Sequence, residues 1–146
     1  MTNPRHARVS AIATLLVLSA CTPAPHRFDI TAVDYSFQVP ATAPAGPTLF
    51  TLVNRGQHLH EVQIYRFMPG ITPDSARKLI GMHDFPDAAL VPGGAVLISE
   101  AGKDSPSQVY AELEKGQVWG LECAFRDSAG APRHNTLGMY AVLEVK

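Results

Sequence analysis

The fold of this chain is limited most strongly by a series of short segments in which apolar and polar residues alternate. Alternating segments occupy residues 28–33, 35–39, 107–113 and 140–145, and short apolar segments occupy residues 48–53, 62–67, 95–99 and 118–124. Alternation with period two is typical of half-buried strands, and turn-forming Gly, Pro, Asn and Asp residues stand between the segments. The sequence therefore predicts an all-β fold, a Greek-key β-sandwich of about seven or eight strands.

One segment departs from this pattern and predicts a helix. Residues 72–74 read Thr-Pro-Asp, which places a capping hydroxyl, a proline at the first helical position and an acid in the first turn. Residues 75–82 can continue the helix, with Ala76, Leu79 and Ile80 on one face. We therefore expect one short helix inserted between strands.

The start of the chain resembles a bacterial secretion signal. Two arginines are followed by an apolar run at residues 9–20, which is too short to span a bilayer. The run ends in Leu-Ser-Ala-Cys, which resembles a lipobox, a motif in which cleavage before the cysteine lets its sulfur carry diacylglycerol. We therefore expect residues 1–20 to be a lipoprotein signal peptide and Cys21 to be the lipidated first residue. An ordinary signal cleaved nearby is the alternative.

The rest of the chain predicts one domain behind a short tether. Residues 21–27 are rich in Pro and Ala and predict a flexible tether, and residues 28–146 are enough for one domain but not for two. A lipid at Cys21 would hold this domain to a membrane on its extracytoplasmic, periplasmic side. Removal of the first 20 residues leaves 10 basic and 13 acidic residues, so we expect no nucleic acid as partner.

The two cysteines of the chain, Cys21 and Cys123, raise a question of pairing. Exported proteins normally use cysteines in pairs, yet Cys123 has no partner if Cys21 is acylated. Metal ligation would explain an unpaired thiol in an oxidising compartment, because a coordinated thiolate is shielded. A buried, inert structural cysteine would explain it equally well.

Two further candidate ligands share the C-terminal connection with Cys123. His134 and Met139 follow it, and His60 stands far upstream at the head of a predicted strand, from which a closed fold could bring it to this connection. One thiolate, two imidazoles and a weak thioether are the ligands of a blue-copper centre, which suits copper in both of its oxidation states.

The arrangement of these residues resembles the cupredoxins, in particular small exported proteins of that family. An early block contains Asn54, Gly56, His60 and Glu61, and a late block contains Cys123, Asp127, Gly130, His134, Gly138 and Met139. The resemblance implies a cupredoxin-like sandwich with copper as cofactor. It also implies His60, Cys123 and His134 as equatorial ligands and Met139 as the axial ligand.

Two details of this ligand set depend on the resemblance alone. His58 and His60 stand two residues apart, so an extended chain would point both to one face, and only the early block favours His60. Ten residues separate Cys123 from His134, where the small electron carriers of this fold use only a few. A longer ligand loop does occur among other copper proteins of the fold.

Two functions remain after this reading of the sequence. The first is a membrane-anchored copper-binding protein that acts as a one-electron carrier through a type 1-like copper site, with a redox partner protein. The alternative is a copper-free module of the same fold that serves binding or assembly in the cell envelope. The sequence shows no triad, carboxylate pair or open metal site, so we do not expect an enzyme.

Overall fold

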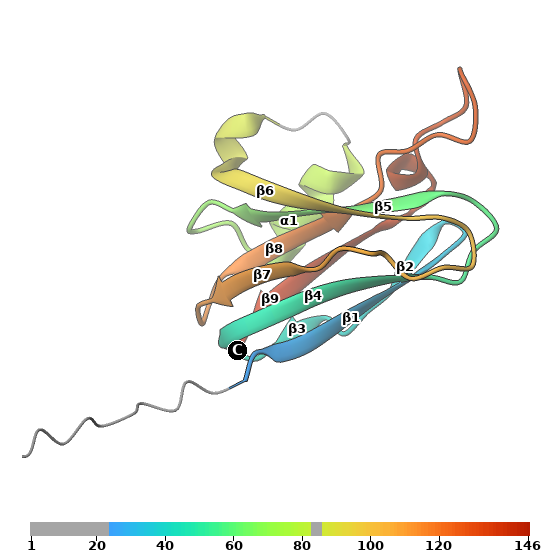
Figure 1. The fold of residues 1–146 in the computed structure, drawn as a ribbon. Coiled ribbons are helices and arrows are strands. Elements are labelled where there is room, and N and C mark those ends of the chain that lie inside the picture. The colour runs from blue at the N-terminus through green and yellow to red at the C-terminus, as the bar shows by residue number, and fades with distance from the viewer. Residues whose placement is uncertain (1–23, 83–85) are drawn as a thin grey trace, which may run out of the picture.

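Two β-sheets packed face to face make up most of the computed structural model, which describes residues 24–82 and 86–146 (Figure 1). The first sheet contains, in spatial order, β2 (Ser36–Gln38), β1 (His26–Val33), β4 (Gly46–Asn54) and β7 (Val109–Leu113). The second contains β3 (Thr42–Ala43), β9 (Tyr140–Val145), β8 (Val118–Glu122), β5 (His60–Phe67) and β6 (Leu90–Ser99). The predicted all-β sandwich is confirmed. Cys21 lies outside the described residues, so its lipidation stays a prediction.

The chain crosses between the two sheets early, and this gives the sandwich its topology. β1 and β4 are parallel neighbours in the first sheet, and β3, which lies between them in the sequence, pairs with β9 in the second. The chain crosses again after β4, because Asn54 ends a strand of the first sheet and His60 begins a strand of the second. The short loop at residues 55–59 therefore lies across one end of the sandwich.

The main core lies between the sheets and needs no metal to form. It is built from inward-facing side chains of both layers, including Phe28, Ile30, Phe50, Leu52, Ile64, Leu97, Leu121 and Leu143. Full burial of an aliphatic or aromatic side chain contributes roughly 1.5–3 kcal/mol. The sandwich therefore has a large source of stability that is independent of any bound ion.

The predicted helix is confirmed as α1 (Pro73–Gly81), and it covers the outer face of the second sheet. The Thr72 hydroxyl accepts a hydrogen bond from the Ser75 amide at 3.2 Å, as expected of a capping residue. Ala76 and Ile80 are fully buried in a second core with Tyr65, Phe67, Val118 and Val142. No helix within the described ranges is long and apolar enough to cross a membrane.

The observed strands differ from the predicted ones most clearly at β1, β3 and β6. β1 begins at His26, inside the predicted tether, because it pairs there with Thr48 of β4. β3 was not predicted, since two residues are too few to show a pattern. β6 begins at Leu90 and contains the Pro-Gly-Gly segment at residues 92–94, which looks like a turn in the sequence. β6 lies at the edge of its sheet, where a proline can be accommodated without a missing ladder bond.

Candidate metal centre

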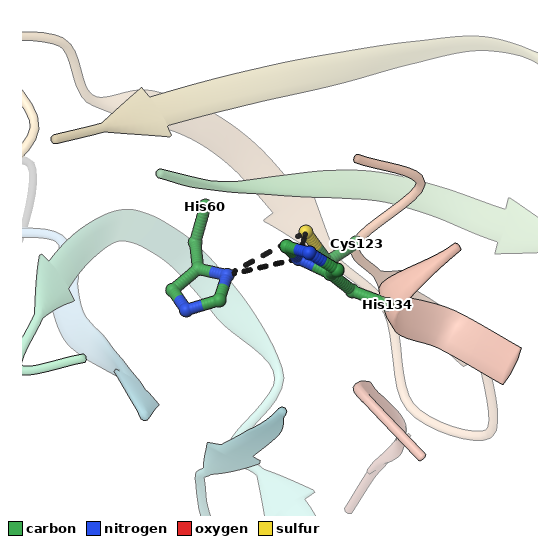
Figure 2. A group of neighbouring side chains, drawn as sticks. All are labelled: His60, Cys123 and His134. Carbon is green, nitrogen blue, oxygen red and sulfur yellow. Dashed lines mark hydrogen bonds between the residues drawn. The ribbon is translucent and has the colours of Figure 1, made fainter. Parts of the chain in front are cut away.

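Three of the predicted ligands, His60, Cys123 and His134, meet at one end of the sandwich (Figure 2). The two Nδ1 atoms of the histidines lie 3.2 Å apart. Sγ of Cys123 lies 3.4 Å from Nδ1 of His134 and 3.9 Å from Nδ1 of His60. All three side chains are buried, with at most 1% of any of them exposed. The fold thus brings together residues that stand far apart in the sequence.

The three side chains come from three different parts of the chain. His60 is the first residue of β5, and Cys123 follows the last residue of β8. These strands are antiparallel neighbours, so the start of one lies beside the end of the other. His134 begins a short 3-10 helix, η2 (His134–Leu137), which lies at the same end of the molecule (Figure 1).

The long connection from Cys123 to His134 closes on itself, so its length does not separate the two side chains. The His134 amide donates to the Phe125 carbonyl at 2.9 Å, and the Asn135 amide donates to the Cys123 carbonyl at 2.7 Å. The chain therefore returns to its starting point after an excursion at residues 126–133. Because of this excursion, ten residues can separate Cys123 from His134 while Sγ and Nδ1 lie only 3.4 Å apart.

Met139 is fully buried, and its backbone is bonded to both ligand segments. Its carbonyl accepts from the Cys123 amide at 3.1 Å, and its amide donates to the His134 carbonyl at 3.0 Å. Gly138 precedes it with φ at 108°, a left-handed conformation that favours glycine and ends η2. Cys123, His134 and Met139 therefore belong to one hydrogen-bonded stretch of backbone.

A carboxylate contacts the Nε2 atom of each histidine, on the side of the ring opposite the cluster. Nε2 of His60 lies 2.9 Å from Oδ1 of Asp34, and Nε2 of His134 lies 3.0 Å from Oδ1 of Asp127. An ionised carboxylate can only accept a hydrogen bond, so each Nε2 carries a proton, and in a neutral ring Nδ1 then keeps a free lone pair. The carboxylates thereby turn both lone pairs towards Cys123.

The surroundings of Asp34, Asp127 and His60 favour the charge states that this pattern requires. Burial raises the pKa of Asp34, but hydrogen bonds from the Gln57 amide, His60 and the His58 amide outweigh it, so the pKa is lowered. The Tyr35 hydroxyl, together with His134, lowers the pKa of Asp127. Burial lowers the pKa of His60 and so favours its neutral form. At neutral pH the carboxylates are ionised and His60 is neutral.

The converging atoms leave room for one cation. Burial raises the pKa of the Cys123 thiol to about 11, so the thiol keeps its proton unless a cation lies beside it. A point equidistant from the three atoms lies about 2 Å from each, close to the roughly 2.0–2.3 Å of zinc bonds to imidazole and thiolate. The cluster can therefore receive a first-row metal ion, and its donor set is suited to copper.

Asn54 and Gly56 fix the loop that leads into His60. The Asn54 amide group donates to the carbonyls of His58 and Ser99 at 2.8 and 3.0 Å, and its oxygen accepts from the Gly56 amide at 2.8 Å. A Cβ at Gly56 would lie 2.2 Å from Oδ1 of Asp34 and 3.0 Å from Nε2 of His60. Asn54 and Gly56 thus support His60, and neither belongs to the predicted ligand set.

His58 lies outside the cluster. Its Nδ1 is 3.0 Å from Oδ1 of Asp127, and 41% of its side chain is exposed. Its ring stacks on Tyr35 with 5.7 Å between the ring centroids. The period-two argument treated His58 and His60 alike, but the loop before His60 is not extended, so the two side chains point to different places.

Asp34 and Tyr35 were not identified as site residues from the sequence. Asp34 interrupts the alternation between residues 28–33 and 35–39, and an acid at such a break is usually a solvated turn residue. The break itself is the only local signal, and nothing in it shows that the carboxylate reaches His60 across the end of the sandwich. Asp127 belongs to the late block, but its contact with His134 was not predicted either.

Comparison with known proteins gives structural relatives only. No protein-family model matches the chain, and no curated protein matches it. Among solved structures, auracyanin from the photosynthetic bacterium Roseiflexus castenholzii has a TM-score of 0.53 and 14% identity, covering 85% of this chain and 99% of that one. Auracyanin A from Chloroflexus aurantiacus, described as a "blue" copper protein, has a TM-score of 0.50 and 16% identity, covering 84% and 100%.

Rusticyanin has a TM-score of 0.50 and 19% identity to the chain, covering 85% of this chain and 82% of that one. At such identities the likeness shows the fold and no more. The chain therefore has the cupredoxin fold, with a His-Cys-His-Met arrangement at one end of the sandwich.

Proposed function

We propose that this protein is a one-electron carrier that binds a single copper ion through His60, Cys123 and His134, with Met139 as a weak axial ligand. The observation that carries the proposal is the convergence of two Nδ1 atoms and one cysteine sulfur within a cupredoxin fold. This donor set suits both Cu(I) and Cu(II), so a change of oxidation state asks for little rearrangement.

Bound copper would supply the one-electron couple, and the residues of the chain would do the rest. Cys123 would lose its proton when the ion binds, because the thiolate is the ligand form. The hydrogen bonds between Cys123, His134 and Met139 would hold these ligands in place in both oxidation states. Burial of the cluster leaves no open position for a substrate, which favours a carrier over an enzyme.

The test is copper titration of the purified, reduced protein. We expect one equivalent of Cu(II) to produce a visible thiolate-to-copper absorption band. The Cys123→Ser variant should lose the band and most of the affinity for Cu(I), whereas Met139→Leu should keep a coloured site with a higher potential. His60→Ala should lose the site, and His58→Ala should keep it. If the folded wild-type protein binds no copper at micromolar concentration, the copper-free binding or assembly module of the cell envelope is the better interpretation.

We further infer that the domain is held to a membrane on its periplasmic side by lipid on Cys21. The support is the lipobox-like end of the apolar run at residues 9–20, since two or more acyl chains give stable anchoring. Mass spectrometry of the mature N-terminus is the measurement. A mature chain that starts at an unmodified residue other than Cys21 would rule the anchor out.

A further inference from the structure

Each histidine of the metal centre has a carboxylate on the ring nitrogen that faces away from the cluster. We propose that Asp34 and Asp127 are positioning residues that orient the two imidazoles and, by increasing their electron donation, favour Cu(II) over Cu(I). The inference deepens the copper function proposed above and rests on it. It concerns the relative affinity of the site for the two oxidation states, and hence its reduction potential.

Asp34 is held by the backbone as well as by His60. It follows the last residue of β1, and its Oδ2 accepts from the Gln57 amide at 2.9 Å while its Oδ1 accepts from Nε2 of His60. The Gln57 amide belongs to the loop that leads into His60. The carboxylate and the imidazole are therefore fixed relative to each other, and the free lone pair of Nδ1 is aimed at Cys123.

Asp127 distributes its charge among three donors. Its Oδ1 lies 3.0 Å from Nε2 of His134 and 3.0 Å from Nδ1 of His58, and its Oδ2 accepts from the Tyr35 hydroxyl at 2.6 Å. The Tyr35 ring also packs edge-on against His134, with 4.9 Å between centroids. Tyr35 therefore both covers His134 and competes with it for the negative charge of Asp127.

The expected effect on copper follows from the charge of the ion. An imidazole that donates its N–H to a carboxylate is more basic at its other nitrogen. Greater donation stabilises the ion of higher charge more, and the interaction is strong because both rings are buried. Loss of such a hydrogen-bond partner typically costs a metal site about 10–100-fold in affinity. We expect that loss to be larger for Cu(II) than for Cu(I).

The first experiment measures the reduction potential of four variants that have bound copper. Asp34→Asn and Asp127→Asn should each raise the potential, because each lowers the affinity for Cu(II) more than the affinity for Cu(I). The rise is about 59 mV for each factor of ten between the two losses of affinity. Tyr35→Phe keeps the ring but removes one donor from Asp127, so it should lower the potential. Asp29→Asn, which removes an equal charge in the middle of β1, is the control and should leave the potential unchanged.

The opposite sign of Tyr35→Phe is the discriminating result. A merely structural role for these residues would loosen the site in every variant and shift the potential in one direction. The inference is overturned if Asp34→Asn and Asp127→Asn have the same potential as the Asp29→Asn control. It is also overturned if Tyr35→Phe raises the potential. Because Tyr35→Phe does not depend on either asparagine variant, it still decides the question if one of them fails to fold.

The second experiment needs no copper and so separates this inference from the proposed function. In the metal-free protein at neutral pH, nitrogen-15 NMR should show His60 and His134 protonated at Nε2 and unprotonated at Nδ1. Asp34→Asn should weaken the Nε2–H hydrogen bond of His60 alone, and Asp127→Asn that of His134 alone. An Nδ1–H tautomer at either ring in the wild type would overturn the positioning role.

Failure of the tuning inference can therefore be distinguished from failure of the proposed carrier function. If copper binds with a visible band but the potentials do not move as described, the tuning role is refuted and the carrier function stands. If the tautomers are as expected but no copper binds, the carrier function is refuted and the carboxylates only orient the rings.

Discussion

Replacement of Gly56 by alanine should damage the metal centre through a residue that touches no ligand atom of the cluster. The added Cβ would lie 2.2 Å from Oδ1 of Asp34, well inside contact distance, and 3.0 Å from Nε2 of His60. Asp34 cannot give way freely, because the Gln57 amide holds its carboxylate. Either the carboxylate leaves His60, or the loop at residues 55–59 shifts and takes His60 with it.

The magnitude follows from these two consequences. Extra atoms forced into a packed site cost about 1–3 kcal/mol of stability. A lost hydrogen bond between a charged and a polar group costs about 1.5–3 kcal/mol, but the two terms overlap because one movement relieves the clash and breaks the bond. We therefore expect Gly56→Ala to lower the free energy of unfolding by about 1–3 kcal/mol, and to lower the affinity for Cu(II) by about 10–100-fold.

The assay compares this variant with Gly120→Ala in urea denaturation and in competitive copper titration. A Cβ at Gly120 would lie 2.2 Å from Cε2 of Tyr65, in the small core beneath α1 and on the sheet face that points away from the cluster. Gly120→Ala should therefore lose comparable stability and keep its copper affinity. The reasoning is wrong if Gly56→Ala binds copper as the wild type does, or if both variants lose affinity equally.

Three further predictions concern the stability of the metal-free protein. Ile80→Ala should lower the free energy of unfolding by about 2–5 kcal/mol, because this side chain of α1 is fully buried, while the visible band of the copper protein should stay unchanged. Asn54→Ala should cost about 1–3 kcal/mol, because it removes the donors to two backbone carbonyls; an unchanged urea midpoint would contradict this. Hydrogen bonds from Thr51 and Arg27 lower the pKa of Asp29 below its ordinary value, so the stability that Asp29 contributes is present above its unfolded pKa and is lost as the pH falls through the folded pKa. Asp29→Asn should therefore flatten the acid limb of a plot of unfolding free energy against pH, and an identical limb would refute the assignment.

The fold could be predicted because its signals are local. Most strands show either a period-two pattern or a short apolar run, and three consecutive residues, Thr-Pro-Asp, indicate the start of α1. Where pairing is decided by a distant partner, the prediction was less accurate. β3 has only two residues, and β6 includes a proline and two glycines that its position at the sheet edge tolerates.

The metal centre could be predicted only in part, for a related reason. The ligand candidates His60, Cys123, His134 and Met139 are recognisable by type and by their blocks in the sequence. The carboxylate of Asp34 has no such signature, because its role exists only where the end of β1 meets the loop before β5. Likewise, a loop that is not extended, rather than any difference in residue type, keeps His58 out of the cluster.

β1 sets the direction in which the metal centre would face if Cys21 carries lipid. The strand starts at His26, and Asp34, directly after its last residue, contacts His60, so its eight residues run about 26 Å towards the site. The five residues before it can span at most about 17 Å. Anchor and copper would thus lie at opposite ends of the domain. An exported partner could reach the copper end from the aqueous side, whereas a donor embedded in the bilayer could reach it only if the whole domain tipped over on its tether.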